Sequence, residues 1–151
     1  MFFSIAPLQQ NRRTIYNCRM WHPKMEEFQG RMKKLFDEVD DYIEDLYGDK
    51  YPLHPVRPPR GETSNPAADG LFYISANFTP GFGSEIGRGY LIKVKMSTLA
   101  KVDEDLRREI YHATVAKVKE LLPLHFPERE LVVRRCRNYF KIQGDFSLGT
   151  A

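Results

Sequence analysis

Residues 71–96 read LFYISANFTPGFGSEIGRGYLIKVKM, two segments separated by a glycine-rich connection. Apolar and polar residues alternate in both segments, which is the pattern of strands with one buried face. The expected inward positions are Phe72, Ile74, Ala76 and Phe78, followed by Tyr90, Ile92, Val94 and Met96. The stretch therefore predicts an antiparallel hairpin over 71–79 and 90–96, with Lys93 and Lys95 on the outward face.

An amphipathic helix is predicted on each side of this hairpin, because apolar residues recur at three- and four-residue steps. The first helix begins at Pro23, and Gly48 follows its last turn as the expected stop. Its apolar stripe is Met25, Phe28, Met32, Leu35, Phe36, Val39, Ile43 and Leu46. The second helix follows Asp103, a suitable N-cap, and Pro123 is expected to terminate it.

The remaining β-forming run, residues 130–142, predicts a last strand, either continuous or broken by a bulge or turn near Arg137-Asn138. The order helix, strand, strand, helix, strand indicates an α+β fold with both helices on one face of a three-stranded mixed sheet. A right-handed crossover would place the last strand parallel to the second strand and beside the first. We expect residues 1–151 to form a single domain, with an N-terminal arm (1–22) and a long proline-rich loop (48–70).

Composition narrows the functional classes. The chain has 151 residues, 42% of them hydrophobic and 28% charged, which suits a soluble globular domain. No apolar run approaches the roughly 18 residues that a membrane helix needs, so no membrane partner and a cytoplasmic location are expected. The two cysteines, Cys18 and Cys136, fit a reducing compartment, and the four histidines lack metal-ligand spacing. Neither a metal nor another cofactor is predicted.

Charge suggests an anionic partner. Residues 86–151 hold thirteen bases against eight acids, whereas residues 24–49 hold nine acids against four bases. Basic side chains interleaved with aromatics on an open sheet face are how several single-stranded nucleic-acid binders attract phosphates and stack bases. The candidate residues are Lys93, Lys95, Arg135, Arg137, Lys141, Tyr73 and Tyr139. The main hypothesis is a binding module for an anionic partner such as nucleic acid, and the alternative is an ordinary solvated strand face.

Two other functional classes stay open. A small-ligand protein or enzyme would place its site between the proline-rich loop 48–70 and the glycine-rich loop 80–89. Its candidate residues are His54, Arg57, Arg60, Gly81, Gly83 and Arg88. The glycine-rich loop lacks a Walker ending and leads into a strand rather than a helix, and no hydrolase triad is identifiable, so the pattern leans away from an enzyme. A structural protein would use the acidic first helix for homo-oligomerisation or docking.

Overall fold

The computed structural model describes residues 23–80 and 87–144. The chain divides into two compact units, Met1–Gly30 with Leu148–Ala151, and Arg31–Ser147. Of the first unit only residues 23–30 are described, as the beginning of a helix, and the expected arm over 1–22 lies outside the described residues. The fold below is that of the second unit, and a single domain over 1–151 stays a prediction.

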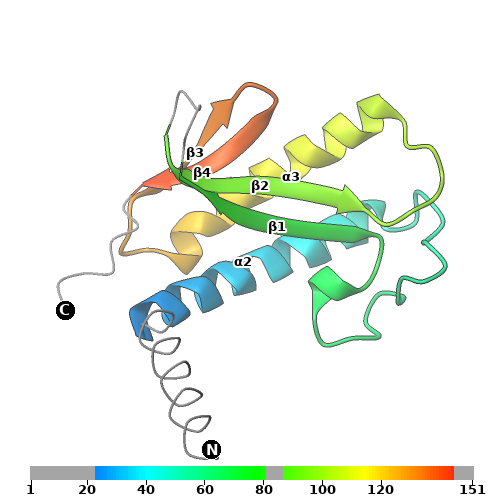
Figure 1. The fold of residues 1–151 in the computed structure, drawn as a ribbon, viewed down its shortest axis with the longest axis horizontal. Coiled ribbons are helices and arrows are strands. Elements are labelled where there is room, and N and C mark those ends of the chain that lie inside the picture. Colours follow the sequence, from blue (N-terminus) through cyan, green and yellow to red (C-terminus); the bar gives the residue numbers. More distant parts are fainter. Residues whose placement is uncertain (1–22, 81–86, 145–151) are drawn as a thin grey trace, which may run out of the picture. The chain divides into compact units, whose positions relative to one another are not determined.

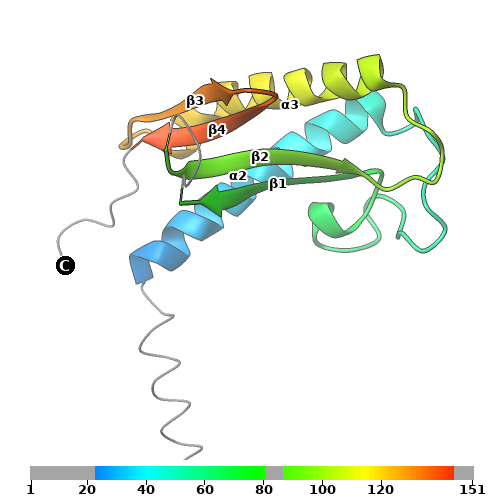
Figure 2. The same cartoon turned by 45° about the horizontal axis from the view of Figure 1, so that its top comes forward.

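Four strands form one antiparallel sheet in the order β1-β2-β4-β3 (Figures 1 and 2). Their bounds are Phe72–Thr79 for β1, Gly89–Met96 for β2, Leu131–Cys136 for β3 and Tyr139–Gly144 for β4. The predicted hairpin is confirmed, since β1 and β2 pair antiparallel with Phe72 opposite Met96. Lys93 and Lys95 are exposed, as the alternation predicted.

The turn considered near Arg137-Asn138 is confirmed, whereas the predicted three-stranded mixed sheet and the place of the last strand beside β1 were wrong. The chain turns at Arg137-Asn138, where Arg137 adopts a left-handed φ of 56°, and returns as β4. β4 pairs antiparallel with both β3 and β2. The crossover through the second helix does make β3 parallel to β2, but the returning strand lies between them. The sheet is therefore four-stranded and antiparallel, and it grows beyond β2 instead of beside β1.

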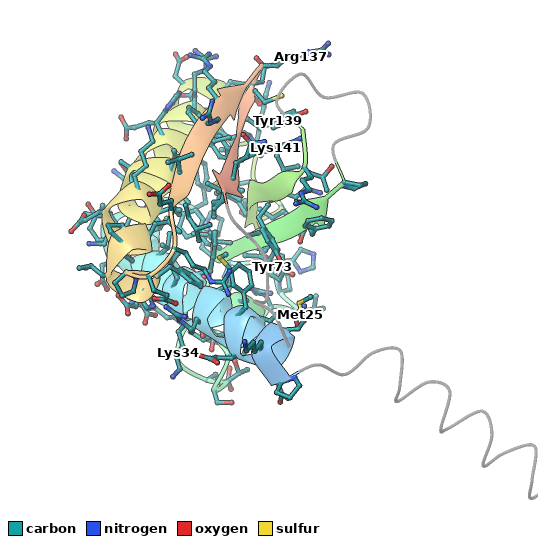
Figure 3. The ribbon with its side chains drawn as sticks, turned by 90° about the vertical axis from the view of Figure 1, so that its left-hand side faces the viewer. Met25, Lys34, Tyr73, Arg137, Tyr139 and Lys141 are labelled. Atoms are coloured by element: carbon teal, nitrogen blue, oxygen red, sulfur yellow. The ribbon has the colours of Figure 1, made fainter. Side chains whose placement is uncertain are left out.

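Two helices, α2 (Pro23–Tyr47) and α3 (Glu104–His125), complete the α+β fold. In Figure 3, α3 and the part of α2 after Gly30 lie on the same side of the sheet, as predicted. They contribute the buried side chains Met32, Leu35, Phe36, Val39, Ile43, Ile110, Val115, Val118, Leu121 and Leu122. No helix in the described ranges is long and apolar enough to cross a membrane.

The ends of the helices follow local chemistry. Asp103 caps α3, with its side chain accepting from the Leu106 N–H, and the N–H of Gly48 closes α2 on the Glu44 carbonyl at 2.8 Å. Pro123 does not terminate α3 as expected. It lies in the last turn, where a missing N–H removes only one hydrogen bond, and the helix continues to His125.

The proline-rich loop 48–70 is fastened to its surroundings. It contains a short 3-10 helix, η1 (Pro66–Ala68), within the range that the sequence predicted as a loop. The guanidinium of Arg57 donates to four carbonyls, those of Ala67, Asp69, Gly70 and Phe72, at 2.7–3.0 Å. Arg60 pairs with Asp41 and Asp45 of α2. These side chains make the loop part of the packed structure.

At Gly70, at the end of this loop, we expect a single methyl group to be disruptive. Gly70 and Gly61 both have positive φ, 72° and 84°, but a Cβ at Gly70 would overlap the Glu44 carboxylate, whereas a Cβ at Gly61 meets nothing within 4 Å. Gly61→Ala should cost about 1 kcal/mol of unfolding free energy through backbone strain alone. Gly70→Ala should cost about 3 kcal/mol, because the buried Glu44 must also move. Urea unfolding measures both, and equal costs would contradict the clash.

Candidate functional site

A cleft opens in the sheet where β2 and β4 separate. The two strands pair at only two positions, Tyr90 with Ile142 and Leu91 with Lys141. The same register would next place Ile92 opposite Phe140, but no pairing is recorded there. Beyond this point β2 and the β3–β4 hairpin diverge (Figures 1 and 2). The sheet is therefore split, with α3 behind the opening.

The hydroxyl of Tyr111 fills the point of divergence. It donates to the Ile92 carbonyl at 2.9 Å and accepts from the Phe140 N–H at 2.9 Å. Burial raises the pKa of Tyr111, so the hydroxyl keeps its proton across the physiological range. Tyr111 of α3 thus replaces a direct bond between the two strands and holds them apart by the width of one oxygen atom.

The cleft is a basic cavity with aromatic walls. Its volume is about 960 Å³, which is within the usual range for small-molecule sites. It is lined by Leu91, Ile92, Lys93, Val94, Lys95, Met96, Glu104, Arg107, Arg108, Ile110, Tyr111, His112, Arg135, Asn138, Tyr139 and Phe140. Five of these residues are lysines or arginines and only Glu104 is acidic. An anionic ligand is the natural complement of this lining.

The ion pairs around the cleft leave its positive charge largely uncompensated. Arg107 lies 3.6 Å from Glu104 and Arg108 lies 3.8 Å from Asp105, and all four side chains are at least half exposed. Such exposed pairs contribute little and are easily exchanged for a stronger anionic partner. Within residues 23–80 and 87–144, no acidic side chain forms an ion pair with Lys93, Lys95 or Arg135.

The structure brings together four of the seven residues of the nucleic-acid hypothesis. Lys93, Lys95, Arg135 and Tyr139 all line the cleft. Tyr73 lies opposite Lys95 in the β1–β2 pairing and is 40% exposed, next to the cleft residue Lys95. Figure 3 shows Tyr73 and Tyr139 on the strands of the sheet.

The other basic residues are placed differently from the expectation. Arg135 lies opposite Phe140 and so on the helix-covered face, and Arg134 takes the place opposite Lys141. Lys141 is only 2% exposed and donates to the Gly87 carbonyl at 3.0 Å, so it anchors the strand connection instead of facing solvent. Arg137 is exposed in the β3–β4 turn, where its carbonyl accepts from Arg135.

The described residues do not form the alternative site between the two loops. Loop 48–70 leads into the first residue of β1, whereas loop 80–89 follows its last residue, and an eight-residue strand spans about 23 Å from first to last residue. Arg57 and Arg60 are engaged with backbone carbonyls and with α2, and the Nδ1 of His54 accepts from Val56. Arg88 is exposed, and Gly81 and Gly83 lie outside the described residues.

Sequence reasoning missed the helical half of the cleft. Arg107, Arg108, Tyr111 and His112 occupy i, i+1, i+4 and i+5 of α3, which places them on one side of the helix. A signal was available, because this group flanks the apolar position Ile110 and combines two cations with two rings. The residues were too far from Lys93 in sequence to be joined to it without the sheet geometry.

A second group of ionisable side chains lies beneath loop 48–70. Asp40 is 2% exposed, Asp69 is 3% exposed and Glu44 is 6% exposed. Glu44 accepts from the Phe72 N–H at 2.8 Å, and Asp69 accepts from Thr63. In the ranges that the structure describes, no three His, Cys, Asp or Glu side chains are arranged to hold a metal ion. These acids are structural features of the packed loop.

Comparison with known proteins gives a family without a stated activity. The model of a family described as "Uncharacterised protein" matches residues 23–144, which include every residue of the cleft. A protein of Borreliella burgdorferi, also described as an uncharacterized protein, is 37% identical over 123 residues, covering 82% of this chain and 96% of that protein. No solved structure matches the chain.

Proposed function

We propose that the chain, which belongs to this family, binds single-stranded nucleic acid at the β2–β4 cleft. The observation that carries the proposal is the gathering of five lysines and arginines around one cavity with a single acid. A cytoplasmic location, where nucleic acid is accessible, is part of the proposal.

Aromatic residues distinguish this site from a simple anion site. Tyr139 and Phe140 line the same cavity as the five basic residues, and Tyr73 is exposed beside it. Single-strand binders combine a positive groove, which follows the phosphates, with rings on which bases stack. Intact duplex would offer phosphates but no free base faces, so the cleft favours a single strand.

Charge reversal on β2 should abolish most of this binding. We expect Lys93→Glu with Lys95→Glu to weaken binding of a fluorescein-labelled twelve-nucleotide single strand at least about 10-fold at 50 mM salt. Fluorescence anisotropy measures the affinity. For the unmodified protein, the logarithm of the affinity should fall with the logarithm of the salt concentration with a slope of about −3, as expected for four or five phosphate contacts.

The control variant reverses the charge of two lysines that lie outside the cleft. Lys34 and Lys50 are exposed, and neither lines the cleft, so Lys34→Glu with Lys50→Glu changes the net charge equally (Figure 3 shows Lys34 on α2, away from the cleft residue Tyr139). This double variant should lose less than about 3-fold in affinity, because only long-range attraction changes. An equal loss in both variants, or no binding by the unmodified protein at 50 mM salt, would refute the proposal.

A further inference from the structure

We infer that the cleft receives one unstacked nucleobase of the bound strand, whose edge hydrogen-bonds to the unpaired backbone of β2 at Val94 and Met96. The inference rests on the proposed function and deepens it, because it turns a general phosphate-binding surface into one with a base pocket. The observation behind it is the split in the sheet, where β2 runs on without a partner.

The direction of the β2 backbone groups follows from the sheet pattern. The Ser97 N–H donates to Leu71 at 2.7 Å, so residue 97 points its N–H toward β1, while the Ile92 carbonyl points toward Tyr111. Backbone groups alternate along a strand, so Val94 and Met96 direct their N–H and C=O groups into the cleft with Ile92. In the described part of the chain, neither residue pairs with a strand on that side.

Backbone N–H and C=O groups of a strand that have no partner strand can bind a ligand with matching donors and acceptors. Val94 and Met96 both line the cavity, and both are half-buried, so their backbone groups are open to a ligand that replaces water. The edge of every nucleobase carries adjacent donors and acceptors in one plane. Such an edge can bind the alternating N–H and C=O groups of β2 as a neighbouring strand would.

The surroundings of this edge fit the rest of a nucleotide. Tyr139 of β4 lines the cavity and offers its ring to a base, and the Phe140 ring beside it packs against Tyr111 and His112. Arg107 and Arg108 of α3 and Lys95 of β2 supply charge for the adjoining phosphates. An extended acidic peptide would also match the charge, but it would have no use for aromatic walls. The combination of strand edge, rings and cations therefore favours a nucleotide.

The test uses the full chain with pentathymidylate as the probe. Each of five probes carries one abasic position, so that a base pocket is revealed by a single position at which loss of the base weakens binding. We expect a loss of about 5- to 100-fold at that position and less than about 2-fold at the others. A probe with 2-aminopurine at the sensitive position should become protected from acrylamide quenching on binding.

A backbone variant links the pocket to β2. Met96→Pro removes the N–H that points away from β1, so the β1–β2 pairing is retained, and Met96→Ala controls for the lost side chain. Met96→Pro should weaken the intact probe about 5-fold more than Met96→Ala does, and should leave the probe that is abasic at the sensitive position unaffected. Circular dichroism confirms that both variants are folded.

The outcomes separate the two proposals. If no pentathymidylate binds at 50 mM salt, the proposed function and the base pocket both fail. If the probes bind but all abasic positions behave alike and 2-aminopurine stays accessible, the pocket is wrong while phosphate binding stands. If hexaglutamate displaces the intact probe at a lower concentration than unlabelled pentathymidylate, the cleft is a peptide site and the inference is overturned.

Discussion

Replacing Arg57 with alanine is expected to lower the free energy of unfolding by about 3 kcal/mol. The reason is that one half-buried guanidinium donates to the carbonyls of Ala67, Asp69, Gly70 and Phe72. Hydrogen bonds to charged groups contribute about 1.5–3 kcal/mol, and alanine would leave these carbonyls without a donor. Thermal unfolding should occur about 6–12 °C lower.

The neighbouring Arg60 provides the matched control. Its partners, Asp41 and Asp45, are exposed carboxylates of α2, and such pairs contribute less than about 1 kcal/mol. Arg60→Ala should therefore lower the melting temperature by less than about 4 °C. Arg57→Lys should recover little, because an ammonium group cannot reproduce the planar fork of donors. A loss of stability in Arg60→Ala equal to that in Arg57→Ala would contradict the role assigned to Arg57.

Arg57 also illustrates what the sequence could and could not reveal. The hypothesis of an anion site considered Arg57 a free cation because it lies in a proline-rich loop with other polar residues. In the folded protein its guanidinium is instead engaged with carbonyls at the end of the same loop and at the start of β1. The sequence indicated that Arg57 could bind an anion. Only the folded loop shows that its partners are carbonyl groups of the same protein.

The part of the fold that follows from the spacing of apolar residues was predictable from the sequence. Strands β1 and β2 and the one-sided helices follow from apolar spacing, because burial imposes that spacing locally. The turn at Arg137-Asn138 was considered only as one option, and the partner of β4 depends on contacts distant in sequence. Lys141 was expected to face solvent, yet a register that pairs it with Leu91 and Arg134 buries it. Which residues line the candidate site therefore depends mostly on how β4 pairs with β2 and β3, which local sequence patterns do not specify.

A buried acid with no partner is a further feature that spacing did not reveal. Asp40 lies four residues after the buried Phe36 and three before the buried Ile43, which placed it beside the apolar stripe. Its Oδ2 has no hydrogen-bond partner, and burial, together with the charges of Glu44, Asp41, Asp37 and Asp69, raises its pKa to about 8. Burial also raises the pKa of Glu44. The folded protein therefore holds a proton on Asp40 at neutral pH.

This shift makes the protein less stable as pH rises. Between the ordinary pKa of an aspartic acid, near 3.8, and the folded value of about 8, the folded state binds a proton that the unfolded state has released. The free energy of unfolding must then fall as pH increases through this interval and level off above it. The direction is opposite to that of a salt-bridged carboxylate, whose contribution is lost on acidification.

Asp40→Asn should remove most of this pH dependence. The amide is close in shape to the protonated acid and never acquires a charge, so the variant should resemble the unmodified protein at pH 5 and exceed its stability by about 2–4 kcal/mol at pH 8.5. Urea unfolding at both pH values measures the difference. The exposed Asp105 of α3, whose charge is not among those that raise the pKa of Asp40, is the control, and Asp105→Asn should leave the pH dependence within about 0.5 kcal/mol of the unmodified protein. If Asp40→Asn loses stability between pH 5 and 8.5 as steeply as the unmodified protein does, the carboxyl of Asp40 is not the buried group that titrates.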